Sequence, residues 1–383
     1  MFRFMPRSLN PRDYIPSIFK FASLRRLTIT AKTHAHPGEN MVAQVIEQHG
    51  GPDVFKTLTI QTPKIKPEHI LIRVEASSVN PVDYKIRKGM SPWLSPALPA
   101  VLHSDVAGVV VEVGEGVRHF KEGDEVYGCA GGFKGNGGAL AEYMLADARL
   151  LAHKPRSLSM VESAAMPLVA ITAFEALFDR AKLKYGQTIL IQGAAGGVGH
   201  LAVQFAILQG ANVYATASST EKLSLVKEYG AIGINYREKK VEEYVQEFTD
   251  GKGFDVVMNT VGGASLADAF TACANNGVVV GISSSATYDL SPMHKKGLSL
   301  HIVFMPGPLV NNVGRERHGE ILKEVAILVD KGLVKPLISR VFPFSQVGAA
   351  HQYLETGPTM GKVGLKQDLN ERKDDNTTKI RPL

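Results

Sequence analysis

The stretch SSVNPVDYKIRKG, residues 77–89, gathers four side chains whose types could do chemistry. Asn80, Asp83, Tyr84 and Lys85 lie in what the pattern predicts to be a loop running into a short helix. A tyrosine hydroxyl, a lysine ammonium and an asparagine amide can each donate a hydrogen bond to a reacting oxygen at neutral pH. Taken alone, the stretch could also be no more than a turn with a proline in it. Its interpretation therefore depends on what the rest of the chain places opposite it.

A second stretch, ILIQGAAGGVGHLAVQFA at residues 189–206, predicts a dinucleotide-binding turn. An apolar strand runs into a glycine-rich turn, and a helix follows at once, as the dinucleotide fingerprint requires. Ala194 stands where the first glycine of the fingerprint would be. Gly196 lets a diphosphate approach the backbone, and Gly199 lets the helix pack on the strand, with Gly197 and Val198 between them. The alternative is a tight turn that binds nothing.

The end of the next predicted strand bears on which dinucleotide is bound. NAD binding calls for an acidic residue about 20 positions on, bonded to the ribose. This chain has Ser218 and Ser219 there, and Lys222 just beyond. Hydroxyls and a cation attract a 2′-phosphate, which favours NADPH. Tyr236, after the third strand, could join the same pocket, whereas Lys222 could instead be a solvated helix residue.

The surrounding pattern predicts the elements that hold these residues. From Met41 onward, short strands punctuated by Gly and Pro indicate a barrel-like β domain. Near residue 160 the spacing becomes helical, with Ser159 as helix cap and Glu162 three residues on. Strands and helices then alternate to about residue 305, which is typical of a doubly wound parallel sheet. The glycine-rich residues 131–138 are expected to form a flexible surface loop.

Four stretches together give a resemblance: NPVDYKIRKG, AAMPLVAITAFEAL, QGAAGGVGHLAVQFA and KEYGAIGINYRE. The chain resembles the medium-chain dehydrogenase/reductase superfamily, and within it the quinone oxidoreductase and zeta-crystallin group with its enal-reducing relatives. The resemblance covers about residues 41–366. It implies an α/β fold in which a GroES-like β-rich catalytic domain contains an inserted Rossmann doubly wound parallel-sheet domain. The expected segments are a basic extension (1–40), the first part of the catalytic domain (41–162), the NADP-binding Rossmann domain (163–305), the return to the catalytic domain (306–366) and a polar tail (367–383).

The resemblance also implies roles for single residues. It places Ser219, Lys222 and Tyr236 around the adenosine phosphate. It assigns Thr172, Asn259 and Gly281 to the nicotinamide side, and Asn80 and Tyr84 to the substrate cleft. The predicted site is therefore the following set: catalytic Asn80, Tyr84 and Lys85; cofactor-binding Thr172, Ala194, Gly196, Gly197, Val198, Gly199, Ser218, Ser219, Lys222, Tyr236, Asn259 and Gly281.

The same comparison argues against a metal. In register with zinc-dependent members of the superfamily, Asn80 stands where a cysteine ligand would be and Ser104 where the histidine would be. No cysteine occurs at residues 166–172, where the third ligand would lie, although a catalytic zinc needs three such ligands. A substitute set of Asp83, His103 and Asp105 is imaginable, but His103 is better explained as a hydrogen-bonded structural residue. We expect no metal.

Without a Lewis acid, alcohol oxidation is disfavoured, whereas a conjugated acceptor is already activated. The predicted function is NADPH-dependent hydride transfer to a quinone or an α,β-unsaturated carbonyl, such as an enone, enal or enoyl thioester. The proton could come from Tyr84, from Lys85 or from water. One alternative is a weakly active or non-catalytic NADPH-binding scaffold, and another is a zinc-dependent alcohol dehydrogenase. The identity of the acceptor stays open.

Composition limits partners and compartment. The formal net charge is +6, and residues 1–38 carry seven basic residues and one acidic residue. The remainder is therefore nearly neutral, and no nucleic acid partner is expected.

The N-terminal composition is that of a mitochondrial transit peptide; the alternative is a disordered arm, or a later start at Met41, on a cytoplasmic protein. Two cysteines cannot form a disulfide framework, and the longest apolar runs are too short for a membrane span. The family favours a homodimer.

Overall fold

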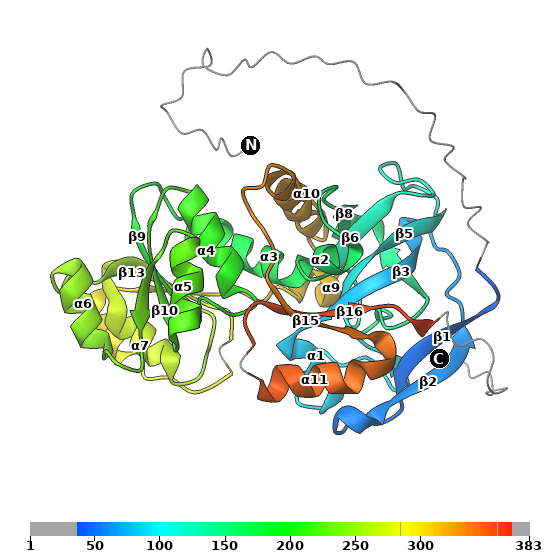
Figure 1. Cartoon of the computed structure of the whole chain (residues 1–383), viewed down its shortest axis with the longest axis horizontal. Coiled ribbons are helices and arrows are strands. Elements are labelled where there is room, and N and C mark those ends of the chain that lie inside the picture. Colours follow the sequence, from blue (N-terminus) through cyan, green and yellow to red (C-terminus); the bar gives the residue numbers. More distant parts are fainter. Residues whose placement is uncertain (1–36, 284, 358, 370–383) are drawn as a thin grey trace, which may run out of the picture. The chain divides into compact units, whose positions relative to one another are not determined.

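The computed structural model describes residues 37–369 with the exception of 284 and 358 (Figure 1). Residues 1–36 of the predicted transit peptide and residues 370–383 of the predicted polar tail lie outside the described residues. Within the described part, no helix is long and apolar enough to cross a membrane.

Two β sheets come from the two ends of the described chain (Figure 1). A three-stranded sheet has the order β2-β1-β4, and a seven-stranded sheet has the order β15-β16-β3-β5-β6-β8, with β7 also paired to β3. The strands are β1 (Asn40–Ile46), β2 (Phe55–Gln61), β3 (His69–Val79), β4 (Ala100–Val101), β5 (Asp105–Val113), β6 (Glu125–Cys129), β7 (Tyr143–Asp147), β8 (Leu151–His153), β15 (Ile338–Pro343) and β16 (Lys362–Lys366). Since β16 pairs antiparallel with β3, Val363 lies opposite Val79. The last strand of the fold therefore brings Lys362 level with Asn80.

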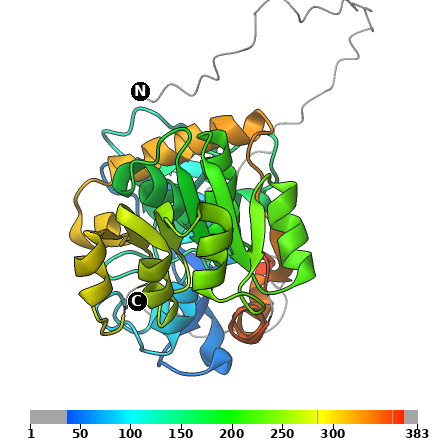
Figure 2. The same cartoon turned by 90° about the vertical axis from the view of Figure 1, so that its left-hand side faces the viewer.

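The middle of the chain forms a six-stranded sheet in the order β11-β10-β9-β12-β13-β14, and every pair in it is parallel (Figure 2). Its strands are β9 (Thr188–Gln192), β10 (Asn212–Ala217), β11 (Ile232–Asn235), β12 (Phe254–Asn259), β13 (Cys273–Gly281) and β14 (Ser299–Ile302). Parallel strands need crossover connections, and helices supply them here. The strand-helix alternation predicted from the sequence is confirmed.

Helices cover both faces of this sheet (Figure 2). Along β9, Ile189 and Ile191 pack into the core that includes α4, whereas Leu190 packs into a second core that includes α6 and α7. This alternation makes the strand apolar at nearly every position. The helices are α1 (Pro81–Arg87), α2 (Met160–Ala164), α3 (Pro167–Phe174), α4 (Gly199–Leu208), α5 (Thr220–Glu228), α6 (Val241–Thr249), α7 (Ser265–Ala272), α8 (Ser291–Lys296), α9 (Gly307–Asn311), α10 (Glu316–Asp330) and α11 (Val347–Thr356), with the 3-10 helices η1 (Pro52–Val54), η2 (Ala148–Leu150) and η4 (Phe344–Gln346) and the π-helix η3 (Glu175–Arg180).

The helical stretch predicted from residue 160 onward is divided. Its cap is as predicted, since Ser159 and Glu162 form a capping box. However, α2 ends at Ala164, and α3 begins at Pro167, because proline lacks the N–H that a continuous helix would need. The π-helix η3 then follows α3 directly. The sequence pattern did not reveal either interruption.

One local prediction was wrong. Residues 131–138 are a surface loop only at their exposed tip, because Phe133 is fully buried and a Cβ on Gly132 would lie 2.6 Å from the backbone of His103. Strand β13 begins at Cys273 and includes residues 275–277, whose types are typical of turns. Its pairing with β12 absorbs these residues through a bulge between Phe254 and Val256.

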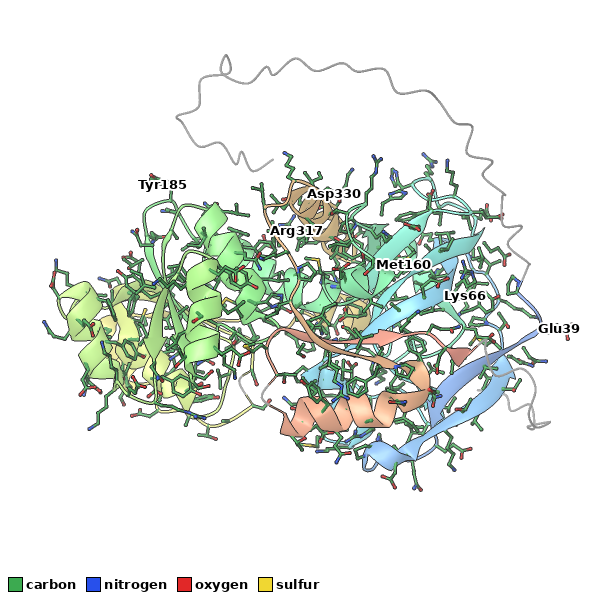
Figure 3. The ribbon with its side chains drawn as sticks, viewed as in Figure 1. Glu39, Lys66, Met160, Tyr185, Arg317 and Asp330 are labelled. Carbon is green, nitrogen blue, oxygen red and sulfur yellow. The ribbon has the colours of Figure 1, made fainter. Side chains whose placement is uncertain are left out.

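Helix α10 is fixed near both of its ends, where Figure 3 labels Arg317 and Asp330. Arg317 pairs with Asp179 at 2.9 Å. Asp330 accepts hydrogen bonds from the backbone N–H of Ser157 at 3.0 Å and from its hydroxyl at 2.9 Å. These contacts attach the return segment to the chain that precedes the six-stranded sheet.

Candidate functional site

The glycine turn follows β9 and has the tight geometry that its sequence predicts. Gly193 has a φ of 72°, a conformation that side chains rarely adopt. A Cβ on Gly199 would lie 2.3 Å from the carbonyl oxygen of Gly193, so only glycine lets the first turn of α4 pack there. A Cβ on Gly196 would lie 3.2 Å from the same oxygen. The backbone is thus free of side chains where the N-terminal end of α4 begins, and such an end favours anionic groups.

Two of the predicted nicotinamide-side residues, Asn259 and Gly281, lie at the carboxyl edge of the same sheet. Asn259 pairs in register with Gln192 on one side and with Gly281 on the other. Its amide nitrogen donates to the Gln192 side chain at 2.6 Å, and its oxygen accepts from the Gly262 N–H at 2.7 Å. Asn259 therefore holds the loops at this edge in place. Thr172 comes from α3 and is buried, with its hydroxyl donating to Leu168 O at 2.7 Å.

The predicted phosphate residues lie at the ends of β10 and β11. Ser219 caps α5 by accepting a hydrogen bond from the Lys222 N–H at 3.4 Å. The Tyr236 N–H donates to Ala217 O at 3.3 Å, which brings the end of β11 beside the end of β10. In the described chain, the Lys222 ammonium makes no hydrogen bond or ion pair. Ser218 is half-buried beside this group, and Tyr236 is exposed.

A buried polar cluster lies at the head of α1, and its centre is the carboxylate of Asp105. That carboxylate accepts from the Ser78 hydroxyl at 2.7 Å, from the Asn80 amide at 2.8 Å and from the Leu168 N–H at 2.8 Å. The Lys362 ammonium lies 3.6 Å from it, donates to Val79 O at 3.0 Å and donates to the Asn80 side-chain oxygen. Asn80, which was predicted to face the substrate, is fully buried and has both ends of its amide engaged.

Asp83 continues this cluster inside the first turn of α1. It is buried and accepts a hydrogen bond from the Asn80 N–H at 2.7 Å, which closes the helix cap. Burial raises the pKa of Asp83 to about 7, and the nearby charge of Asp105 adds to the rise. The hydrogen bond from Asn80 and the charge of Lys362 act in the opposite direction.

Tyr84 and Lys85 lie on the same helix but are only half-buried. Burial raises the pKa of Tyr84, and the charge of Glu355 acts the same way, so the hydroxyl keeps its proton through neutral pH. The Lys88 ammonium lies 5.5 Å from the centre of the Tyr84 ring and pairs with Glu355. Among the described residues, the Tyr84 hydroxyl and the Lys85 ammonium make no hydrogen bond, so both stay available to another molecule.

His103 turns away from the Asp105 cluster. Its φ of 75° is unusual for a residue with a side chain, and its Nε2 lies 2.8 Å from Nε2 of the buried His351. Burial lowers the pKa of His103 to about 3, and it lowers that of His351 well below the ordinary value, so the pair is neutral. In the part of the chain that the structure describes, no three His, Cys, Asp or Glu residues are placed to hold a metal. His103 is hydrogen-bonded to His351, and its structural role stays a prediction.

Two features of the site were missed from the sequence. Lys362 stands in MGKVGLK, where a lysine directly between glycine and an apolar stretch was the available signal. Trp93, the sole tryptophan, is 58% exposed, and its ring lies 5.0 Å from that of Phe304, which is 39% exposed. Phe304 follows β14 at the carboxyl edge of the parallel sheet, and Trp93 follows α1. This aromatic pair therefore lies between the two parts of the predicted site.

Two family models match the chain. One, described as an alcohol dehydrogenase GroES-like domain, matches residues 66–156, and the other, described as a zinc-binding dehydrogenase, matches residues 231–364. Both matches agree with a catalytic domain that surrounds a dinucleotide-binding one.

Curated relatives match over most of their length. An NADPH-dependent alkenal/one oxidoreductase, chloroplastic, of Arabidopsis thaliana is 35% identical over 334 residues, which are 85% of this chain and 79% of that protein. A 2-methylene-furan-3-one reductase of Solanum lycopersicum is 36% identical over 361 residues, which are 90% of this chain and 86% of that protein.

Solved structures confirm the predicted fold. An alcohol dehydrogenase superfamily protein from Novosphingobium aromaticivorans is 40% identical with a TM-score of 0.82, covering 86% of this chain and 100% of that one. Escherichia coli quinone oxidoreductase complexed with NADPH is 28% identical with a TM-score of 0.74, covering 85% of this chain and 99% of that one.

The buried Asp83 gives a test of the cluster through stability. Because the folded pKa of about 7 exceeds the ordinary 3.8, the folded state retains a proton that the unfolded chain releases. The contribution of Asp83 to the free energy of unfolding should therefore be lost as the pH rises between those two pKa values. The loss is at most about 1.4 kcal/mol per pH unit. We expect the free energy of unfolding of Asp83→Asn, measured with urea across this range, to depend less on pH than that of the wild type. If the free energies of unfolding of Asp83→Asn and of the wild type changed with pH in the same way, this prediction would be wrong. Asp53→Asn, at an exposed position, is the control.

Proposed function

The chain belongs to the medium-chain dehydrogenase/reductase superfamily, and from that premise we propose that it is an NADPH-dependent reductase of quinones or α,β-unsaturated carbonyls that works without zinc. The observation that carries the proposal is the pairing of two features. The turn at the carboxyl edge of the parallel sheet has glycine where a diphosphate would approach, and helix α1 carries Tyr84 and Lys85, whose hydrogen-bond donors are not engaged by the described residues.

NADPH fits the residues of the turn and of the β10 end. Gly196 leaves room for a diphosphate at the start of α4, and Gly199 lets that helix pack closely against the carbonyl oxygen of Gly193. Ser219, Lys222 and Tyr236 would hold the 2′-phosphate, since hydroxyls and an unpaired ammonium suit that anion. The reductant named for the Arabidopsis relative is the same dinucleotide.

The donor set supports a reaction without zinc. Zinc prefers thiolate, imidazole and carboxylate ligands, and here an amide stands at Asn80 and a hydroxyl at Ser104. The ammonium of Lys362 contacts Asn80 directly, and a second cation at that point would be repelled. One of the matching family models is described as zinc-binding, but its match begins at residue 231 and does not include these positions.

The chemistry then divides between the cofactor and the chain. NADPH, when bound, supplies the hydride. The acceptor's oxygen gains negative charge as the hydride arrives at the conjugated carbon or ring, and that oxygen needs a hydrogen-bond donor or a proton. Tyr84 and Lys85 can donate there because neither is engaged by the described residues. The Trp93–Phe304 pair gives an apolar surface against which a conjugated acceptor can lie.

An acceptor panel tests the proposal. With quinones, enals, enones and enoyl thioesters offered in turn, we expect NADPH to be consumed with at least one class, and NADH to be used about tenfold less efficiently, as one lost ion pair implies. Lys222→Met should narrow this preference, whereas Lys227→Met, exposed on the same helix, should leave it intact. The measurement is kcat/KM from loss of reduced-nicotinamide absorbance.

Other outcomes would favour the alternatives. Tight NADPH binding without consumption of any acceptor would indicate a scaffold protein. About one zinc per chain together with alcohol oxidation would indicate a zinc-dependent alcohol dehydrogenase.

The proton donor can be tested separately. If Tyr84 donates the proton, Tyr84→Phe should lower kcat by about 100-fold or more while NADPH binding stays unchanged. Tyr185→Phe is a suitable control because Tyr185 is 85% exposed and Figure 3 shows it at the surface, away from α1. A kcat for Tyr84→Phe close to that of the wild type would assign the proton to water or Lys85.

We also propose a homodimer formed through the edge of the six-stranded sheet. Support comes from β14, which ends the strand order on one side and leaves Ile302 40% exposed. An uncovered edge strand can pair with a second copy of itself.

The N-terminal extension is proposed to direct import into mitochondria, on its composition alone. One measurement on the native protein checks both proposals: its mass after isolation from organelle and cytosolic fractions. We expect a mitochondrial particle of two chains, each shorter than the 41.4 kDa precursor. A cytosolic, full-length monomer would contradict both.

A further inference from the structure

Lys362 is a buried lysine whose contacts reach both halves of the site. Its side chain is 3% exposed, and lysine is almost never buried unless it is paired. The ammonium donates to Val79 O at 3.0 Å and to the side-chain oxygen of Asn80, and it lies 3.6 Å from the carboxylate of Asp105. Every one of these partners lies at or beside the head of α1.

The stem of the same side chain lies against the glycine turn. A Cβ on Gly197 would come within 3.3 Å of the Lys362 Cδ, so the turn and the stem are already in close contact. One residue earlier, the Gly361 N–H donates to Ala195 O inside the turn at 2.9 Å. Residues 361–362 thus touch the predicted diphosphate-binding turn with their backbone and stem, and the head of α1 with the ammonium.

The Lys362 ammonium also balances a buried negative charge. The buried carboxylate of Asp105 needs a nearby cation, and removal of one partner of a buried pair is strongly destabilising. In the described chain, Lys362 is the cationic side chain that contacts this carboxylate. Asp105 also holds the first turn of α3 through Leu168, so one ion pair connects α1, α3 and β16.

We propose that Lys362 is a positioning residue, an internal cation that holds the head of α1 at a fixed distance from the glycine turn and so sets the approach of the acceptor to the hydride donor. This inference rests on the proposed function. Asn80 stands where zinc-dependent relatives are expected to have a metal ligand, and the ammonium of Lys362 organises that point here.

Hydride transfer is sensitive to such positioning, because the reacting atoms must come within about 3–3.5 Å and a misplacement of about 1 Å can cost about 100-fold. Lys362→Met keeps an apolar stem against Gly197 and removes the ammonium with its charge and its hydrogen bonds to Val79 and Asn80. We expect its kcat to fall about 10–100-fold while its NADPH affinity stays close to that of the wild type. With deuterated NADPH, the isotope effect on kcat should rise, because hydride transfer becomes the slow step.

The matched control is Lys366→Met, which changes an exposed lysine at the other end of β16. It should leave kcat, affinity and isotope effect unchanged. If Lys362→Met does not fold, Lys362→Met/Asp105→Asn removes both buried charges, and such neutral replacements are often tolerated. This double variant should still show the reduced kcat and the raised isotope effect.

A readout independent of activity separates this inference from the proposed function. Hydrogen exchange of the full chain should become faster at residues 81–87 and at residues 193–199 in Lys362→Met, but not in Lys366→Met. If the wild type shows no turnover and Lys362→Met still shows the faster exchange in both segments, the proposed function would be overturned and the positioning role would be kept. A folded Lys362→Met with unchanged exchange, or with kcat within twofold of the wild type and the same isotope effect, would overturn the positioning role.

Discussion

The arrangement of the site depends on one interaction, the burial of the Lys362 ammonium beside the Asp105 carboxylate. Removing two charges from water costs several kcal/mol per ion, and only close partners offset that cost. Here those partners are a backbone carbonyl at Val79, the Asn80 side chain and the carboxylate itself. Val79 and Asn80 lie at the end of β3, Asp105 begins β5 and Lys362 begins β16, so the cluster can form only when these three strands are correctly paired.

The same requirement explains why the chain returns to its first domain. Asn80 and Lys362 are 282 residues apart, and the six-stranded sheet lies between them in the sequence. The return segment is attached to that sheet's first helix on the way back. The Leu337 N–H donates to His200 at 3.2 Å, and the Gln204 side chain donates to Lys335 O at 3.1 Å. The dinucleotide turn and the acceptor side are thus held by one strand and the segment before it.

Some of the fold could be predicted because its causes are local. The Ser159–Glu162 capping box and the turn at Gly199 were predicted from short patterns, and both are present. In contrast, the helix break at Pro167 was missed because a long apolar period concealed it. The buried Phe133 was missed because glycine neighbours suggested an exposed loop. Strand β13 includes turn-forming residues because its pairing with β12 continues past them through a bulge.

The features of the site also divide into those with local causes and those that depend on tertiary contacts. The sequence by itself determined the class of fold and the cofactor turn, because each follows from residue types at fixed short spacing. Only the tertiary structure decided that Asn80 is a buried link, that Tyr84 and Lys85 keep their donors free, and that Lys362 belongs to the site at all. The physical reason is that burial and ion pairing depend on which residues meet in the folded chain. Residues 282 positions apart share no local sequence pattern that could predict their contact.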